Sequence, residues 1–471
     1  MQQPAAAARR VRTATRVGSA AGAATLVLRS VVAATGSMCV AGLAAPSAFA
    51  QAAPPSASPA PLPAPAAAPA AAPATALLTL EQAIARSLQR HPAVVGAAAE
   101  REVADEGLRR AGRWANPTIT VDSENVLGVG PYRSFDSAET TVSLTQEIPL
   151  GGKRSSDLRG ARAGQEAAGL AVRIAELEVR RDVTIAYAAA VAADRLAAIA
   201  RDRARVATET RSAAEQRFTA GVESELRRSS VEVAAARAQA TARRASAESI
   251  ARRRALAQSW RDETTEQPLD AAWFDAVAAE VDESAHAASP AELAQHPQVR
   301  AAQIEYRRAQ AALDFERAQR VPNLEATIGT RRFAAAPGGE DHALVLGLSA
   351  PLPLWYRNGE NIAAARARLT RAEIAAERAP QDLRAVQDAA LAELDAARLE
   401  LRTLTTTGLP AAENAARLAR QAYDAGRLSL AERLDAEAAL FEVREQVENI
   451  RLEVHRAHAT LAYTAAGERG R

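Results

Sequence analysis

Polar and apolar residues alternate along four short segments of the chain. In residues from about 117 to 127, Ile119 and Val121 fall on one side of an extended strand, and threonines and acids fall on the other. The segments at about 140–149, 322–331 and 342–352 repeat this alternation. A period of two is typical of strands that turn one apolar face away from water. The pattern therefore predicts four strands, each apolar on one face and polar on the other.

Between these strands, alanine, arginine, glutamate and leucine dominate long stretches with few prolines. A first helical stretch is predicted from about Leu80 to Arg113, with an interruption at His91-Pro92. The longer helices are predicted at about 154–218, 225–260, 360–423 (interrupted by Pro380) and 429–463. Sixty-odd residues at about 1.5 Å each make the first of these roughly 95 Å long. Helices of that length do not fit inside a rounded domain.

The last helix carries a heptad pattern. Leu440, Val447, Val454 and Leu461 recur every seven residues, which is typical of a coiled-coil seam. Charged residues flank the seam, and we expect them to be solvated: Arg444, Glu445, Glu448 and Arg451. His455 and His458 lie three residues apart without a firm third ligand, so a surface pair is expected rather than a metal site.

The chain contains an internal duplication. His91-Pro92 recurs as His296-Pro297, and Ala220-Gly221 recurs as Ala425-Gly426, both at a shift of 205. We predict a first repeat at 77–288, which ends in a connecting segment at about 261–288, and a second repeat at 289–471. Proline suits the first turn of a helix, so both histidines are expected at helix boundaries rather than in metal sites.

The N-terminal region is predicted to contain a signal peptide and a linker. Residues 1–50 carry five arginines, an apolar run of about 15 residues and a small-residue cleavage pattern, which predicts a signal peptide. A transmembrane anchor is the alternative, but the run falls short of the ~20 residues that a bilayer requires. Residues 51–76 consist almost entirely of Ala, Pro and Ser and are expected to be a disordered linker. Removal of the five arginines would turn the net charge from +2 to −3, so the charge gives no basis for binding nucleic acid.

Composition and motifs exclude several kinds of chemistry. The single cysteine, Cys39, rules out an internal disulfide and a CxxC zinc site. We find no nucleophile elbow, zinc motif or phosphate-binding loop. The sequence therefore predicts neither an enzyme nor a resident cofactor or metal.

The predicted elements require several copies of the chain. Four strands cannot close a barrel, and an open sheet leaves exposed edges. Three copies would supply 12 strands, an even number within the range of outer-membrane barrels. We therefore predict a mainly α fold with a small β part, in which several copies of the chain close a barrel that the long coiled-coil helices continue.

The motifs resemble a known family. The duplicated helix–hairpin–helix unit is similar to the TolC family of outer-membrane factors over about 78–467. The stretch QEIPLGGKR (146–154) resembles the strand-exit motif of the family's CzcC-like, heavy-metal branch, and 217–221 and 422–426 resemble its periplasmic tip turns. The resemblance implies a homotrimer, in which a 12-stranded barrel is continued by an α-helical periplasmic tunnel. This trimer would be a passive duct in the outer-membrane lipid of a Gram-negative bacterium. Its partners would be a periplasmic adaptor and an inner-membrane pump of the resistance–nodulation–division type.

The resemblance leaves the cargo open. The heavy-metal branch points to divalent cations of the Co, Zn and Cd type. Multidrug efflux and type I secretion are alternatives, because the pump rather than the duct selects the substrate. A periplasmic coiled-coil adaptor or scaffold is an alternative of another class, although adaptors do not need two pairs of amphipathic strands.

The resemblance also assigns a gate. In TolC-like tips, two carboxylates three residues apart follow the turn, and Glu432 and Asp435 match those positions. The alternative is a solvated helix start, where acids are favoured by the helix dipole. The first copy departs from the family, because Arg227-Arg228 stand where relatives carry an acid. We expect either arginine to pair with Glu432 or Asp435 in a closed state.

Two further sets of residues complete the predicted site. The tip turns are expected to contact the adaptor through Ala220, Gly221, Ala425 and Gly426. Pro149, Gly151 and Gly152 are expected to form the corner between strand and helix at the membrane edge.

Overall fold

The structure is a computed structural model that describes residues 77–466, apart from 136, 263–266, 280–287 and 337–338. The predicted signal peptide (1–50) and linker (51–76) lie outside the described residues, and so does part of the connecting segment at about 261–288.

Each copy of the duplicated unit opens with a broken helix. In the first copy α1 (Leu80–Arg90) and α2 (Pro92–Ala111) meet at His91, and in the second α6 (Pro290–Gln295) and α7 (Pro297–Ala318) meet at His296. Nδ1 of His91 accepts the N–H of Ala93 at 3.2 Å, and Nδ1 of His296 accepts the N–H of Gln298 at 3.3 Å. Both histidines therefore cap a helix that starts on proline, and the prediction of helix boundaries is confirmed.

The long helices follow the strands of each copy. In the first copy they are α3 (Lys153–Thr219) and α4 (Glu225–Gln258), and the short helix α5 (Ala272–Ala279) lies in the connecting segment. In the second copy they are α8 (Gly359–Thr403), α9 (Leu409–Asp424) and α10 (Leu430–Thr464).

The prediction of an interruption at Pro380 is wrong, because α8 runs through that proline. The helix is interrupted further along the chain, where a π-helical turn at Leu404–Gly408 separates α8 from α9. Pro410 follows this turn. A proline has no N–H for the carbonyl four residues earlier and clashes with it, and a π turn relieves the conflict.

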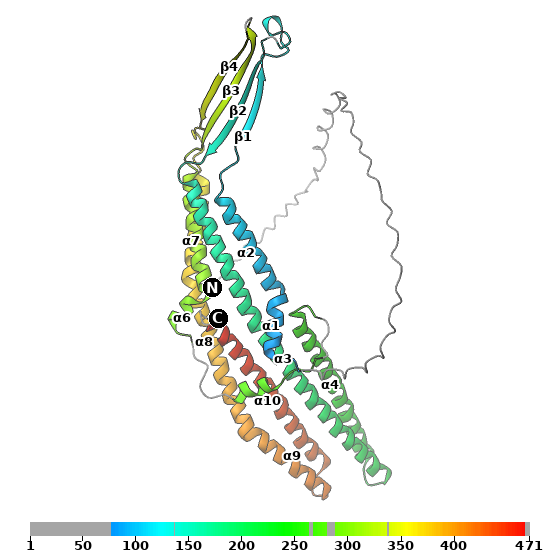
Figure 1. Ribbon diagram of the computed structural model, residues 1–471. Coiled ribbons are helices and arrows are strands. Elements are labelled where there is room, and N and C mark those ends of the chain that lie inside the picture. The colour runs from blue at the N-terminus through cyan, green and yellow to red at the C-terminus, as the bar shows by residue number, and fades with distance from the viewer. Residues whose placement is uncertain (1–76, 136, 263–266, 280–287, 337–338, 467–471) are drawn as a thin grey trace, which may run out of the picture. The chain divides into compact units, whose positions relative to one another are not determined.

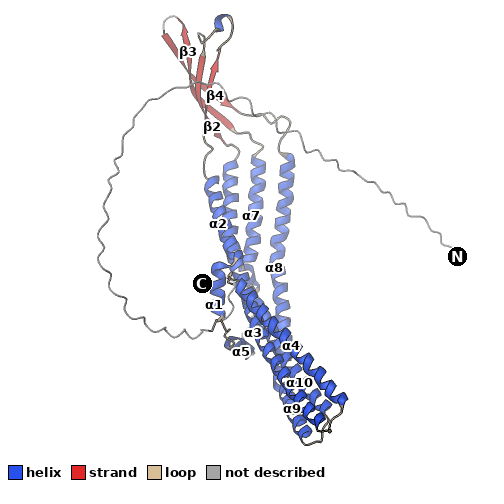
Figure 2. Cartoon of the chain, turned by 90° about the vertical axis from the view of Figure 1, so that its right-hand side faces the viewer, coloured by secondary structure: helices blue, strands red, loops and turns tan. Residues whose placement is uncertain are grey.

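The four predicted strands form one antiparallel sheet in the order β1-β2-β3-β4 (Figure 2). They are β1 (Thr118–Glu124), β2 (Glu139–Ile148), β3 (Leu324–Ala336) and β4 (Gly339–Ser349), and the loop between β1 and β2 contains a 3₁₀ turn at Gly130–Tyr132. Residues directly opposite each other share a face of the sheet. Ile119, Leu144, Ile328 and Leu346 form one such row, and Thr118, Thr145, Thr327 and Gly347 form the next row on the other face.

The helices nearest the sheet pack in the same order as the strands to which they connect (Figure 1). Helix α3 lies between α2 and α7, and α7 also packs on α8. Strand β1 and helix α2 therefore form one edge of the described chain, and β4 and α8 form the opposite edge. The buried core is spread along these contacts in several small clusters rather than in a single centre.

Helix α3 is apolar enough to be mistaken for a membrane span. One window of 18 residues has a mean hydropathy of 1.5, but 56% of that window is buried inside the chain. Val183, Tyr187 and Val191 pack there with α1 and with Leu256 of α4. We therefore interpret this part of α3 as a core helix.

Candidate functional site

The two tip turns have the same backbone. Gly221 follows α3 with a φ of +75°, and Gly426 follows α9 with a φ of +72°. The N–H of Val222 donates to the carbonyl of Arg217 at 2.9 Å, and the N–H of Arg427 donates to the carbonyl of Ala422 at 2.8 Å. This is the pattern with which glycine commonly ends a helix. Ala220, Gly221, Ala425 and Gly426 are all exposed, so both turns are open to a partner.

The two predicted gate acids differ in their surroundings. Glu432 is the third residue of α10, and its carboxylate accepts the N–H of Ser429 at 3.0 Å and the hydroxyl of Ser429 at 2.6 Å. These bonds form a capping box and hold the pKa of Glu432 below its ordinary value. Asp435 is exposed, and it has no ion pair or side-chain hydrogen bond with any other residue in the described part of the chain. Glu432 therefore fixes the helix start, whereas Asp435 is available to face a neighbour.

The two predicted gate arginines pair within their own hairpin. Arg227 contacts Glu223 at 3.2 Å. Arg228 lies 3.6 Å from Glu225, and its guanidinium lies over the ring of Phe218. Neither arginine pairs with Glu432 or Asp435 within the described chain. The expected pair would have to form between copies, and it stays a prediction.

Sequence reasoning missed a polar cluster beside the tip. Nη1 of Arg217 in α3 donates to the hydroxyl of Tyr423 in α9 at 2.8 Å, which links the two helical hairpins. Arg433 lies over the same ring and contacts the buried Glu437 at 3.1 Å. Arg420 contacts Glu437 as well, at 3.2 Å. The i, i+4 spacing of Arg433 and Glu437 was a usable signal, but nothing local predicted the contact with α3.

The corner between β2 and α3 is closely packed. Gly151 and Gly152 have φ values of +72° and +82°. A Cβ on Gly151 would lie 2.7 Å from Cβ of Val321 and 3.1 Å from the carbonyl oxygen of Ala318, so a larger residue does not fit there. Pro149 precedes the two glycines. Beyond them, Lys153 donates to the side chain of Asn323, which connects the corner to β3.

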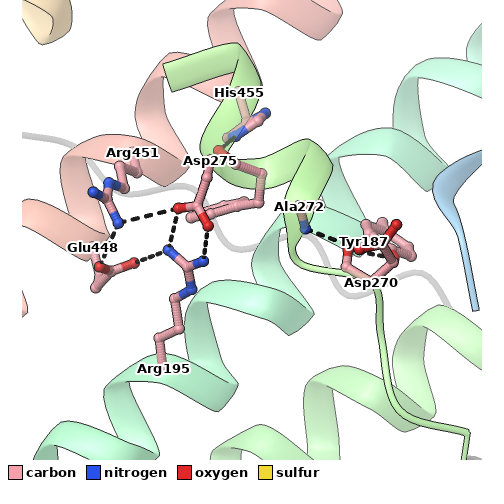
Figure 3. A network of polar contacts seen from close by, with 9 residues as sticks. Tyr187, Arg195, Asp270, Ala272, Asp275, Glu448, Arg451 and His455 are labelled. Carbon is pink, nitrogen blue, oxygen red and sulfur yellow. Dashed lines mark hydrogen bonds and ion pairs between the residues drawn. The ribbon is translucent and has the colours of Figure 1, made fainter. Parts of the chain in front are cut away.

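The structure corrects two expectations about α10. His455 is not at the surface: it is 1% exposed, stacks on Phe274, and donates from Nε2 to the carbonyl of Phe274 at 2.9 Å. Burial lowers its pKa to about 4. The prediction failed because α5, which covers this face of α10, comes from the distant connecting segment (Figure 3).

Glu448 is also buried rather than solvated. It contacts Arg451 at 2.8 Å and Arg195 of α3 at 3.3 Å. Arg195 holds Asp275 of α5 through two hydrogen bonds of 2.8 and 2.6 Å. The hydrogen bond from Arg195 is the main cause that lowers the pKa of Asp275. Three helices are thus joined by one ionic network (Figure 3).

Among the residues that the structure describes, no group of three or more His, Cys, Asp or Glu side chains could hold a metal ion. Neither the tip nor the ionic network around Arg195 contains such a group. Instead, Glu437 pairs with Arg433 beside the tip, and Asp275 pairs with Arg195 in the network.

A family model described as outer membrane efflux protein matches residues 83–260 and 289–468. The chain belongs to this family. The two matched blocks correspond to the two copies of the duplicated unit, and membership of the outer membrane efflux family places the chain in the outer membrane.

Individual relatives agree with the family. Over 293 residues the chain is 32% identical to the nickel and cobalt resistance protein CnrC of Cupriavidus metallidurans, which covers 61% of this chain and 68% of that protein. Over 386 residues it is 25% identical to the cobalt-zinc-cadmium resistance protein CzcC of the same species, with 82% and 89% covered. The fold is similar to that of the Campylobacter jejuni CmeC outer membrane channel, with a TM-score of 0.70 at 15% identity over 83% of this chain and 87% of that one.

Proposed function

We propose that three copies of this chain form the passive outer-membrane duct of a tripartite efflux system, and that the duct exports divalent heavy-metal cations. The observation that carries the proposal is the exposed apolar face of the sheet. Ile119, Leu144, Ile328 and Leu346 lie on that face and are 40–71% exposed. Apolar side chains in such a row are stable in lipid rather than in water.

The open edges of the sheet support a trimer. Strands β1 and β4 each pair with only one strand of the described chain. In lipid an unpaired edge costs several kcal/mol for each unsatisfied backbone group, so the sheet has to be closed by other strands. Three copies supply 12 strands and close it.

The polar face of the sheet would line the duct. It carries Asp122, Glu147, Glu325 and Asp341, and Arg331 is paired there with Glu139 at 3.0 Å. Acids outnumber bases on this face. Rings of acidic side chains favour cations in a pore.

The metal cargo is supported by the relatives, which are named for resistance to nickel, cobalt, zinc and cadmium. A duct of this kind performs no chemistry and needs no cofactor. A proton-driven pump of the resistance–nodulation–division type would supply the energy, and a periplasmic adaptor would join that pump to the turns at Gly221 and Gly426.

For the gate, we propose that Asp435 faces the axis in each of the three copies. Because the carboxylate of Glu432 already accepts a hydrogen bond from Ser429, Asp435 is the stronger candidate for binding or repelling ions there. Arg227 or Arg228 of a neighbouring copy would neutralise it in the closed state. If the variant Arg227→Ala/Arg228→Ala shows unchanged bilayer conductance and antibiotic leak, no such ion pair closes the gate.

The proposed function is tested by deleting the gene and measuring growth over a range of Ni, Co, Zn, Cd, Cu and Ag concentrations. We expect lowered tolerance to at least one divalent metal, restored by the wild-type gene. Lost tolerance to drugs alone would instead assign the chain to multidrug efflux. The trimer is tested separately by detergent extraction: a heat-modifiable trimer from outer membranes supports the duct, and a soluble periplasmic monomer contradicts it.

A further inference from the structure

The connection from β4 to α8 (350–358) carries an exposed apolar group at one edge of the chain. Leu352 is 73% exposed, Leu354 62% and Trp355 93%. Such a group at an edge is typical of a surface that a partner covers. The question is which molecule covers it.

The backbone holds this group in a fixed position. Pro351 and Pro353 restrict φ, and the N–H of Leu354 donates to the carbonyl of Leu352 at 2.9 Å. At the far end of the connection, Nδ2 of Asn358 donates to the carbonyl of Glu316 in α7 at 2.8 Å. Trp355 is therefore presented by an ordered segment, which lowers the entropy cost of binding a partner.

The duplication supplies a template for that partner. The equivalent corner of the first copy lies between β2 and α3, where Val321 of the α7–β3 connection covers Gly151. At the shift of 205, residues 319–321 correspond to 114–116, which connect α2 to β1. In the described chain that connection lies on the opposite edge, and its Trp114 is 57% exposed. A second copy would place its 114–116 connection over the corner at Trp355, as Val321 lies over Gly151.

Helix α2 shows the same relation. Val103 of α2 is exposed, and it corresponds to Arg308 of α7 at the shift of 205. In α7 the side chain at this position reaches α3 although it is 56% exposed, because Nε of Arg308 lies 3.9 Å from where a Cβ on Gly164 of α3 would be. The strand directions also agree: β1 and β4 run antiparallel to each other, since each step in the sheet order is antiparallel. The edge at β4 and α8 thus matches the edge at β1 and α2 of another copy.

We infer that Trp355, with Leu352 and Leu354, docks against Trp114 and its neighbours in the next copy of this chain. The contact would join the copies where the barrel passes into the helices. This inference rests on the proposed trimer. It adds the residues that form one junction between the copies.

Paired cysteines test the contact in the full-length protein. The sequence has one cysteine, Cys39, which is first replaced by serine. In that background we combine Trp114→Cys with Trp355→Cys and oxidise outer membranes. Dimer and trimer bands that are reversed by reductant are expected on denaturing gels, with each single-cysteine variant staying monomeric. Co-expression of the two single-cysteine chains should give dimers, because each bond would then join two chains.

The matched control combines Trp355→Cys with Val129→Cys. Val129 is more exposed than Trp114 (86% against 57%) but lies in the loop at the other end of the strands, so accessibility alone would favour the control. The test compares the cross-linking rate of the Trp114→Cys/Trp355→Cys pair with that of this control pair. If the two rates are equal while the trimer persists on native gels, the inference is overturned and the proposed duct stands. Strong quenching of Trp355 emission by brominated lipid, measured as the difference from Trp355→Phe, would also overturn it, because lipid would then cover the residue. If the wild-type protein forms no trimer, the proposed function itself fails.

Discussion

The return helices α4 and α10 occupy equivalent places in the two copies but pack through different side chains. At the shift of 205, five seam positions of α10 correspond to five positions of α4. In α10 they are Leu440, Val443, Val447, Ile450 and Val454, and in α4 they are Ala235, Ala238, Ala242, Ala245 and Ser249. The duplicated unit has kept its backbone and its register while the size of the seam residues has changed.

The difference in size implies opposite weaknesses. Ala238 and Ala242 meet Ala200 and Ala204 of α3, so at these positions only methyl groups lie between the two helices. Ile450 and Val454 meet larger residues of α8, among them Leu394. Buried apolar area stabilises the second seam more, whereas the alanine seam depends on close approach of the helices. We therefore expect the second seam to be sensitive to truncation and the first to enlargement.

Truncation of the second seam is expected to have the largest effect. Ile450→Ala should lower the free energy of unfolding by about 2–5 kcal/mol, because a buried isoleucine leaves a cavity. Denaturant unfolding in detergent measures this. Ile250→Ala is the control, since Ile250 is the exposed equivalent of His455 on α4, and it should cost far less. Equal losses would show that the second seam is not the stabilising one.

Acid should weaken the contact between α5 and α10. His455 has a pKa of about 4 in the folded chain against an ordinary 6.5, so below pH 6.5 only the unfolded chain binds the proton. The contribution of neutral His455 to the free energy of unfolding is then fully present above pH 6.5. It falls by up to about 3 kcal/mol as the pH drops to 4. Protonation would place a hydrogen on Nδ1, which has no acceptor among the described residues.

The variant His455→Gln should flatten this pH dependence, as measured by Tm between pH 7 and pH 4. The contribution of Asp275 can be separated from it. Its pKa lies below the ordinary 3.8, so the stability that it contributes is lost only at still lower pH. An unchanged slope in His455→Gln would exclude His455 as the cause.

Enlargement of the first seam should cost about 1–3 kcal/mol. Ala242→Val introduces the side chain that the equivalent Val447 carries into a buried cluster of alanines, where added methyl groups should force the helices apart. Ala240→Val on the exposed face of the same helix is the control, and should cost at most about 0.7 kcal/mol through helix propensity. A neutral Ala242→Val would mean that the α3–α4 contact is loose.

The smallest effect is expected at the tips, where the two copies again differ. Ser429 and Glu432 form a capping box, whereas Ser224 only accepts the N–H of Arg227 at 3.3 Å. Ser429→Ala should cost about 1 kcal/mol and Ser224→Ala less, because a capping box satisfies two backbone donors. Hydrogen exchange in the first turns of α10 and α4 would report each loss separately. If Ser224→Ala accelerated exchange in α4 more than Ser429→Ala accelerated it in α10, the expected order of the two effects would be wrong.

Most of the fold was predictable from periodicity. The four strands, their apolar faces, the two histidine caps and the heptad seam of α10 all follow from spacing within one segment. The π turn before Pro410 was missed because the residue composition of a helix is the same with or without one extra residue in a turn. At the tip, the position of both turns could be predicted. The partners of Arg227, Arg228 and Glu432 could not, since several charges compete within the reach of each side chain.

The sequence by itself determined the order of the elements, the duplication and the face of each strand, because these depend on repeating patterns along the chain. Only the tertiary structure decided which faces of the helices are covered. His455 and Glu448 lie on an apparently polar flank of α10, and they are buried because α5 and α3 arrive there from elsewhere in the chain. Trp355 shows the converse. A large apolar side chain such as that of Trp355 is expected in a core. Trp355 lies instead on an edge that one copy of the chain cannot cover, and it is left exposed.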